Sequence, residues 1–329
     1  MLKVFLATLD PALTLFVFMA IGFALNKAKI LPQNTSKILA TLLTWVFMPA
    51  LSFNAISTYC TLDSLGNNAI NLIFGIISVL IAVALSIFLS RFFVKEKCAE
   101  LGIYRYALAF ANLGYFGDPL VLGILGPEAL AYYKIFTLPY SITIYTWGIA
   151  ILVPQGTEKK SVIKQLLNPP TIATFCGIIV GLTGLGNFFP SFISSTVNQL
   201  GNCVGPIAMI IGGFTVANYS IPVMLKNKKV YVVTAVRLIA LPIIMVSILV
   251  GLRAIVSTLL DITINNSVLF LCLIGTAGPL GLNTIVFPEA YGGDPRTGAS
   301  MATISHTLGV ITVPIMYTIA VALFGAYGT

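Results

Sequence analysis

The chain has 329 residues, of which 58% are hydrophobic and 9% are charged. A soluble domain carries about a quarter of its residues charged, so this composition excludes a soluble enzyme, a disordered chain and a fibrous protein. The net charge of +8 comes from small basic clusters between apolar runs, which is typical of membrane topology signals and not of nucleic-acid binding. The five scattered cysteines form no CxxC pair, so they indicate neither a disulfide framework nor a zinc site.

Ten apolar runs are long enough to cross a bilayer as helices. We expect these spans near residues 5–25, 38–58, 70–93, 104–125, 133–153, 171–188, 199–220, 231–252, 267–290 and 299–324. None alternates in polarity as a membrane barrel would, so the fold class is an all-α membrane protein. The connecting segments are short and leave no room for a separate soluble domain.

Lysine and arginine residues gather on the odd-numbered loops between these spans. The positive-inside rule then predicts that the odd loops face the cytoplasm and that both termini lie outside. We expect the protein to reside in the plasma (inner) membrane. A cleaved signal peptide is the alternative interpretation of residues 1–25, but this first span takes part in an internal repeat.

The repeat appears as prolines that recur in the same order in both halves of the chain. Pro119 in the fourth span matches Pro279 in the ninth, and the triplet that begins at Pro127 matches the triplet that begins at Pro288. With five spans in each half, the second half must be inverted in the membrane, which is typical of secondary transporters. The sequence thus predicts two five-helix repeats, 1–160 and 161–329.

The fourth and ninth spans contain helix-breaking residues near their middles. Asn112, Gly114 and Pro119 interrupt the fourth span, and Pro279 and Asn283 interrupt the ninth. Matched breaks at the midplane indicate discontinuous helices that line a binding site, with ordinary proline kinks as the alternative. The freed helix N-termini favour an anion, to which the two asparagines would donate hydrogen bonds. Since no arginine lies at that depth, we expect a carrier of modest affinity.

Two titratable residues are candidates for ion coupling. Asp118 is either the N-cap of the second half-helix, with Pro119 at its first position, or a proton- or cation-coupling site. His306 lies inside the tenth span, where an ionisable residue is a functional candidate; the alternative is a neutral histidine bonded to a neighbouring hydroxyl. Lys134 and Arg237 are expected to lie near span ends and extend toward the membrane surface.

These residues resemble the auxin efflux carrier family of membrane transporters. The resemblance covers nearly the whole chain and rests on Asn112-x-Gly114-x-x-Gly117-x-Pro119, Asn168-Pro169, Arg237-Leu238, Ala277-x-Pro279 and Ala290-Tyr291-Gly292-Gly293-Asp294. The family includes bacterial permeases for malate, malonate and similar acids, and its fold is similar to that of the bile acid:sodium symporters. The resemblance implies that helices 4 and 9 cross, that helices 1, 2, 6 and 7 form a scaffold, and that helices 3–5 and 8–10 move. It also implies a homodimer formed through the scaffold.

The chain departs from the family pattern at two titratable positions. Asp118 stands where an apolar residue is usual, and His306 separates a Ser and a Thr that are usually adjacent. The short central loop 154–170 lacks the long insert of plant auxin exporters, which favours a bacterial-type organic-acid permease.

The sequence therefore predicts a secondary transporter of small mono- or dicarboxylates that works by alternating access. The absence of a GxxxxGK[ST] loop argues against ATP-driven transport. We expect no enzymatic activity, cofactor, metal site or nucleic-acid partner, and H⁺ as the coupling ion, with Na⁺ as the alternative. Two other functions stay open: a sodium-coupled symporter of the bile-acid type and a ligand-sensing membrane receptor.

Overall fold

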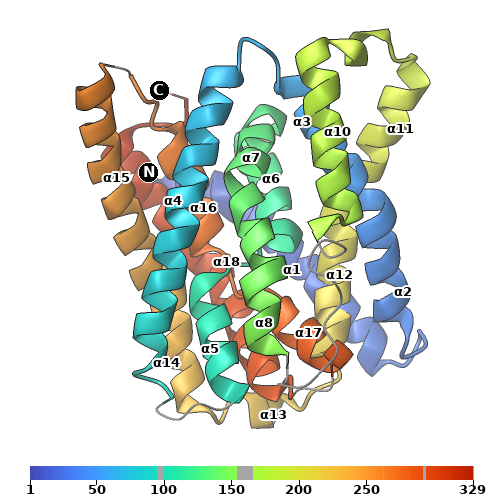
Figure 1. Cartoon of the computed structure of the whole chain (residues 1–329). Coiled ribbons are helices and arrows are strands. Elements are labelled where there is room, and N and C mark those ends of the chain that lie inside the picture. Colours follow the sequence, from blue (N-terminus) through green and yellow to red (C-terminus); the bar gives the residue numbers. More distant parts are fainter. Residues whose placement is uncertain (95–98, 154–165, 262, 292–293, 329) are drawn as a thin grey trace.

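The computed structural model describes residues 1–94, 99–153, 166–261, 263–291 and 294–328, and in these ranges helices joined by short connections form the structure (Figure 1). An isolated antiparallel bridge between Ala111 and Leu280 is the single β-type pairing in the described ranges, and it belongs to no strand. The prediction of an all-α protein is confirmed.

The first half of the chain contains eight α-helices and three π-helical turns within the described residues. They are α1 (Leu2–Lys27), α2 (Thr35–Leu42), η1 (Leu43–Phe47), α3 (Met48–Tyr59), α4 (Leu65–Ser90), α5 (Ala99–Ala109), η2 (Leu113–Gly117), α6 (Asp118–Leu125), α7 (Pro127–Thr143), η3 (Ile144–Gly148) and α8 (Ile149–Leu152).

The second half likewise consists of α-helices with a few short π or 3₁₀ turns. Its described elements are α10 (Pro169–Thr183), the 3₁₀ turn η4 (Leu185–Phe188), α11 (Ser191–Asn202), α12 (Val204–Val216), α13 (Ile221–Met224), α14 (Lys228–Ala235), the π turn η5 (Val236–Ala240), α15 (Leu241–Leu260), α16 (Ser267–Ala277), α17 (Asn283–Tyr291) and α18 (Arg296–Phe324). Each of the ten expected apolar runs is helical, and the fourth and ninth are interrupted.

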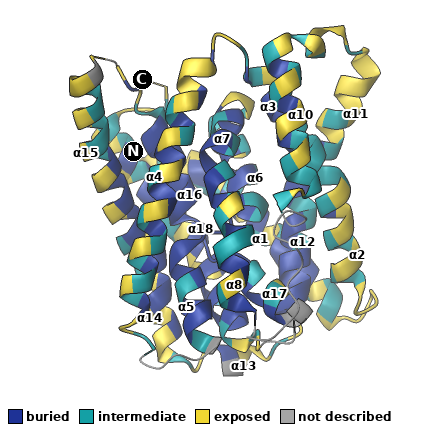
Figure 2. Cartoon of the chain, viewed as in Figure 1, coloured by how far each residue is buried: buried dark blue, intermediate teal, exposed yellow. Residues whose placement is uncertain are grey.

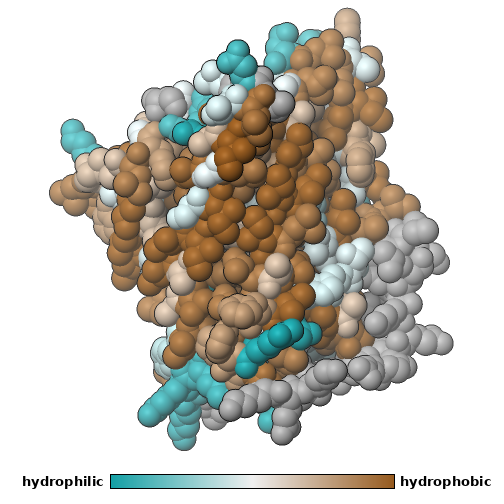
Figure 3. Space-filling model, turned by 60° about the vertical axis from the view of Figure 1, so that its left-hand side comes forward, coloured by the Kyte–Doolittle hydropathy of each residue, from teal (hydrophilic) through white to brown (hydrophobic). Residues whose placement is uncertain are grey.

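The outer surface of the bundle is apolar. Among the described residues, seven helices are long and apolar enough to cross a membrane, and Leu113–Leu125, Pro169–Thr183 and Ser267–Ala277 are shorter apolar helices. Side chains such as Leu80 and Leu259 are 63% and 77% exposed. Figure 3 shows hydrophobic side chains covering the middle of this face, with hydrophilic ones at its two ends. An apolar belt of this kind is stable in lipid, so the chain is an integral membrane protein.

Three of the π-helical turns end just ahead of a proline, with one residue between. Each of η1, η2 and η5 ends two residues before Pro49, Pro119 or Pro242, respectively. A proline ring cannot donate a hydrogen bond and clashes with the carbonyl of the preceding turn. The wider π turn relieves that clash while the helix continues, so these prolines do not end their helices.

The buried core lies in the middle of the bundle, where α16 and α18 are shielded by the surrounding helices (Figure 2). Beside it, α1 and α12 pack with their backbones in contact. A Cβ atom on Gly22 would overlap the backbone of Ile210, and one on Gly213 would overlap that of Met19. Such small-residue contacts are typical of helix packing in membranes, and they fix α1 against α12.

Both chain ends lie toward the upper end of the bundle in Figure 1, and α13 lies at the opposite end. This agrees with an even number of membrane crossings, but the direction of the chain in the membrane stays a prediction. Part of its basis falls outside the described residues, namely Lys95, Lys97, Lys159, Lys160 and Lys164.

Candidate functional site

The two interrupted helices meet at their breaks. After α5 ends, the backbone amide of Asn112 donates a 2.8 Å hydrogen bond to the carbonyl of Pro279, next to the bridge between Ala111 and Leu280. The amide of Leu280 in turn donates to the Ser305 hydroxyl of α18 at 3.0 Å. Backbone groups freed by the breaks therefore find partners in the other break and in α18, as buried groups in a membrane must.

Glycine permits this close approach. A Cβ atom on Gly278 would lie 3.4 Å from the Cβ atom of Ala111, and one on Gly281 would lie 3.3 Å from the Ala111 carbonyl oxygen. Side chains larger than a methyl group at these positions would push the two breaks apart.

A cavity of about 130 Å³ lies beside the meeting point. Its lining includes the first residues of η2 on one side and Gly281, Leu282 and Asn283 at the start of α17 on the other. Its polar lining residues are Thr44, Ser52, Asn112, Tyr115, Asp118, Lys134, Thr137, Ser141, Tyr145, Asn168, Thr171, Thr174 and Asn283. The volume suits a few water molecules or one small organic molecule.

Asp118 and Lys134 form an ion pair in the wall of this cavity. The carboxylate accepts a hydrogen bond from the Lys134 ammonium of α7, and the two side chains are 2% and 11% exposed. Lys134 is thus turned inward, and the prediction that it extends to the membrane surface is wrong. The lysine supplies a cation at the depth where the sequence suggested none.

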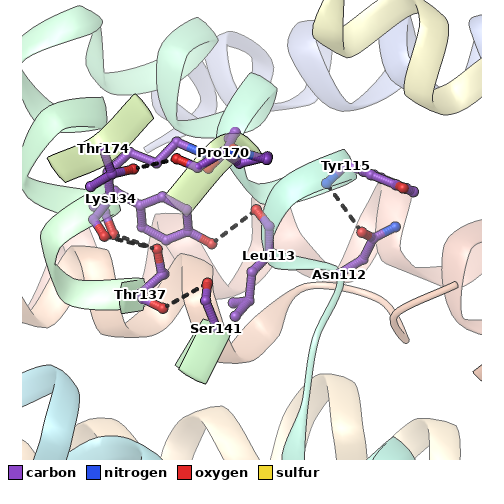
Figure 4. A network of polar contacts seen from close by, with 10 residues as sticks. Asn112, Leu113, Tyr115, Lys134, Thr137, Ser141, Pro170 and Thr174 are labelled. Atoms are coloured by element: carbon purple, nitrogen blue, oxygen red, sulfur yellow. Dashed lines mark hydrogen bonds and ion pairs between the residues drawn. The ribbon is translucent and has the colours of Figure 1, made fainter. Parts of the chain in front are cut away.

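Asp118 is not a helix cap. The second half-helix of the fourth span consists of η2 followed directly by α6, without a gap. It therefore begins at Leu113, five residues before Asp118. Its N-cap is Asn112, whose side-chain oxygen accepts a 3.2 Å hydrogen bond from the amide of Tyr115 (Figure 4). The capping interpretation of Asp118 is therefore wrong, since its helix starts more than one turn before it.

His306 is held in a neutral form by two hydrogen bonds. Its Nδ1 lies 2.8 Å from the carbonyl of Ala302, which can only accept, so Nδ1 carries the proton. Its Nε2 lies 3.2 Å from the side-chain nitrogen of Asn112, which donates to it. The expected hydroxyl partners, Ser305 and Thr307, bond to the backbone instead. The histidine is 3% exposed and lies behind Asn112.

The side chain of Asn283, like that of Asn112, donates a hydrogen bond to another side chain. Its side-chain amide donates a 2.9 Å hydrogen bond to the hydroxyl of Tyr106 in α5. Both asparagines line the cavity, as does Gly114. One amide proton of each asparagine is already used within the protein.

The two predicted site prolines do not line the cavity. Pro119 faces α12, where a Cβ atom on Gly205 would lie 3.0 Å from its ring. Pro279 packs toward Gly309 of α18 and contributes its carbonyl to Asn112. The two prolines therefore shape the breaks, and residues close to them in sequence line the cavity.

Arg237 is buried and not at a membrane surface as expected. It is 3% exposed, and its Nη1 donates a 3.4 Å hydrogen bond to the carbonyl of Leu108. Its Nε and Nη2 have no hydrogen-bond partner in the described part of the chain. Leu108 lies in the last turn of α5, where a positive charge offsets the negative end of a half-helix. Arg237 therefore stabilises the first break from its other side.

A family model described as "Membrane transport protein" matches residues 7–317. The chain belongs to the auxin efflux carrier family of membrane transporters. An uncharacterized transporter of Methanocaldococcus jannaschii is 24% identical over 212 residues, which are 64% of this chain and 69% of the relative. An uncharacterized transporter of Methanothermobacter thermautotrophicus is 22% identical over 214 residues, with the same coverage of both chains. The resemblance inferred from the motifs is confirmed, and the protein is a member of a transporter family.

Proposed function

We propose that the protein is a secondary active transporter of small organic anions, mono- or dicarboxylates, that works by alternating access. The observation that carries this proposal is the cavity between the starts of η2 and α17, which also contains the ammonium of Lys134. A helix N-terminus has a positive partial charge and unpaired amides. Two such ends and a lysine around one small cavity favour a carboxylate.

The proposed architecture has ten membrane-crossing segments in two inverted repeats, 1–160 and 161–329. The scaffold consists of helices 1, 2, 6 and 7, which correspond to α1, α2–α3, α10 and α11–α12. Glycine contacts between α1 and α12, and between α3 and α10, support a rigid unit. The remaining helices form the moving unit. A homodimer through the scaffold, in the plasma membrane with both termini outside, completes the proposal.

Uptake by proteoliposomes tests the function. The purified protein is reconstituted and supplied with labelled pyruvate, lactate, malonate and malate, while sodium and proton gradients are varied separately. Uptake above that of protein-free liposomes supports the proposal, and dependence on the proton gradient identifies H⁺ as the coupling ion. Uptake that requires sodium identifies the bile-acid type of symporter. Saturable binding without any uptake would identify a receptor and contradict transport.

A further inference from the structure

The charge in the cavity comes from two residues. Of the described residues that line it, Asp118 and Lys134 are the only ones that are charged at neutral pH, and they are paired with each other. We propose that Lys134 binds the carboxylate of the transported anion, and that Asp118 takes the anion's place in the anion-free state and accepts a proton when displaced. This inference rests on the transport function proposed above.

The hydroxyl groups around Lys134 are already used as donors. Thr137 donates to the carbonyl of Tyr133 at 2.8 Å, Ser141 donates to that of Thr137 at 3.3 Å, and Thr174 donates to that of Pro170 at 2.9 Å (Figure 4). An anion that met only their oxygen atoms would be repelled. These hydroxyls make the wall polar, but they do not select for a negative charge.

Lys134, in contrast, has donors to spare. An ammonium group has three protons, and Asp118 is its one hydrogen-bond acceptor among the residues described. Its side chain is also more exposed than that of Asp118, at 11% against 2%. A carboxylate in the cavity can therefore approach the lysine from the open side, and a charge-assisted hydrogen bond to it is the strongest contact available there.

Asp118 depends on Lys134 alone. No other donor contacts its carboxylate in the described part of the chain. If the lysine turns to a substrate, an ionised Asp118 would be buried without a partner, which is strongly unfavourable. A proton on Asp118 removes that charge. Lys134 stays positive, the bound carboxylate balances it, and Asp118 is neutral, so each anion enters with one proton.

Among the described residues that line the cavity, Lys134 is the only group of opposite charge to Asp118. Tyr115 on η2 and Tyr145 on η3 line the same cavity, Tyr133 lies next to Lys134 on α7, His306 bonds to Asn112, and the exposed Asp10 lies on α1. The charged residues at the ends of these helices, Lys3, Lys27, Glu128 and Arg296, do not line the cavity. Neither α12 nor α16 contains Asp, Glu, His, Lys or Arg. Tyr133 donates to the carbonyl of Leu113, and both ring nitrogens of His306 bond elsewhere, to Asn112 and Ala302. When Lys134 leaves Asp118 for the substrate, the proton that neutralises the remaining negative charge must therefore bind to Asp118 itself.

Single and double neutral variants separate this role from a purely structural ion pair. Lys134→Gln should lower uptake of labelled pyruvate and malonate about tenfold or more, as expected for a lost charge-assisted contact. Asp118→Asn should raise the apparent affinity and abolish accumulation driven by a proton gradient. The double variant should be as inactive as Lys134→Gln. Exposed residues provide the matched controls, Lys27→Gln and Asp63→Asn, which should behave like wild type.

A structural pair predicts a different pattern. Each single variant would then be impaired because it leaves a lone buried charge, and the double variant would regain wild-type uptake. That recovery would overturn the proposal. If wild-type protein takes up none of the acids, the transport function itself fails, which is a distinguishable result.

A measurement on the wild-type protein covers the case in which variants do not fold. A pH-sensitive dye trapped inside weakly buffered proteoliposomes reports protons that enter with pyruvate. We expect one proton per molecule taken up, in excess of the acidification in protein-free liposomes. Uptake without such acidification contradicts the proposal.

Discussion

The two breaks have similar backbones but different chemistry. Each joins an extended segment to a helix start that lines the cavity, and an asparagine lies at each start. The first half adds Asp118 and Lys134, whereas Gly278 stands before the matching proline of the second half and none of the described second-half lining residues is charged. The two helix starts at the cavity thus come one from each half of the chain, and among the described lining residues only the first half supplies charged side chains.

The second break should be the more sensitive of the two to added bulk. A Cβ atom on Gly298 of α18 would overlap the carbonyl of Thr284 in α17. Gly298→Val should lower the free energy of unfolding by about 3 kcal/mol, because the helices must separate. Gly251→Val is the control, since no described atom beyond the backbone of its own helix and its chain neighbours lies within 4 Å of a Cβ atom there. Thermal unfolding in detergent measures both, and equal stability would contradict the close packing.

At the first break, a side chain added at Gly117 would clash with one hydroxyl group. A Cβ atom on Gly117 would overlap the hydroxyl oxygen of Tyr133. Gly117→Ala should cost about 2 kcal/mol of stability, and adding Tyr133→Phe should restore part of it by removing that oxygen. An additive loss in the double variant, measured by the same unfolding assay, would show that the clash is elsewhere.

The two asparagines should differ in their effect on stability. Asn112 caps η2 and donates to His306, whereas one bond, to Tyr106, is found for the Asn283 side chain. Asn112→Ala should cost about 2 kcal/mol and Asn283→Ala about 1 kcal/mol. Each should also weaken substrate binding, by about 1–2 kcal/mol if its second amide proton reaches the anion. Unchanged affinity in both folded variants would remove them from the site.

The smallest effect is expected for His306. Because both ring nitrogens have partners suited to a neutral ring, His306→Gln should leave the shape of the pH profile of uptake unchanged. Asp118→Asn should flatten that profile. A flattened profile in the His306 variant would instead transfer the coupling role to the histidine.

Hydropathy and the matched Pro, Gly and Asn residues were enough to predict the helices and the two breaks. They did not show where the first half-helix begins, because Asp118-Pro119 is a usual start signal and the π turn before it keeps the helix intact. The ion pair, however, could have been predicted. Asp118 and Lys134 are equidistant in sequence from Gly126, where the chain turns between α6 and α7, so they lie at the same level of two antiparallel helices.

The backbone contact between α1 and α12 makes this helix pair a natural reference for measuring motion. Since Gly22 and Gly213 leave no space between the helices, spin labels at the exposed positions Val17 on α1 and Phe192 on α11 should keep one narrow distance distribution, because α11 and α12 form one apolar span. A label at Leu80 on α4 would report displacement against that fixed frame. The displacement of α4 in the proposed alternating-access cycle then becomes a distance that spectroscopy measures without the substrate being known in advance.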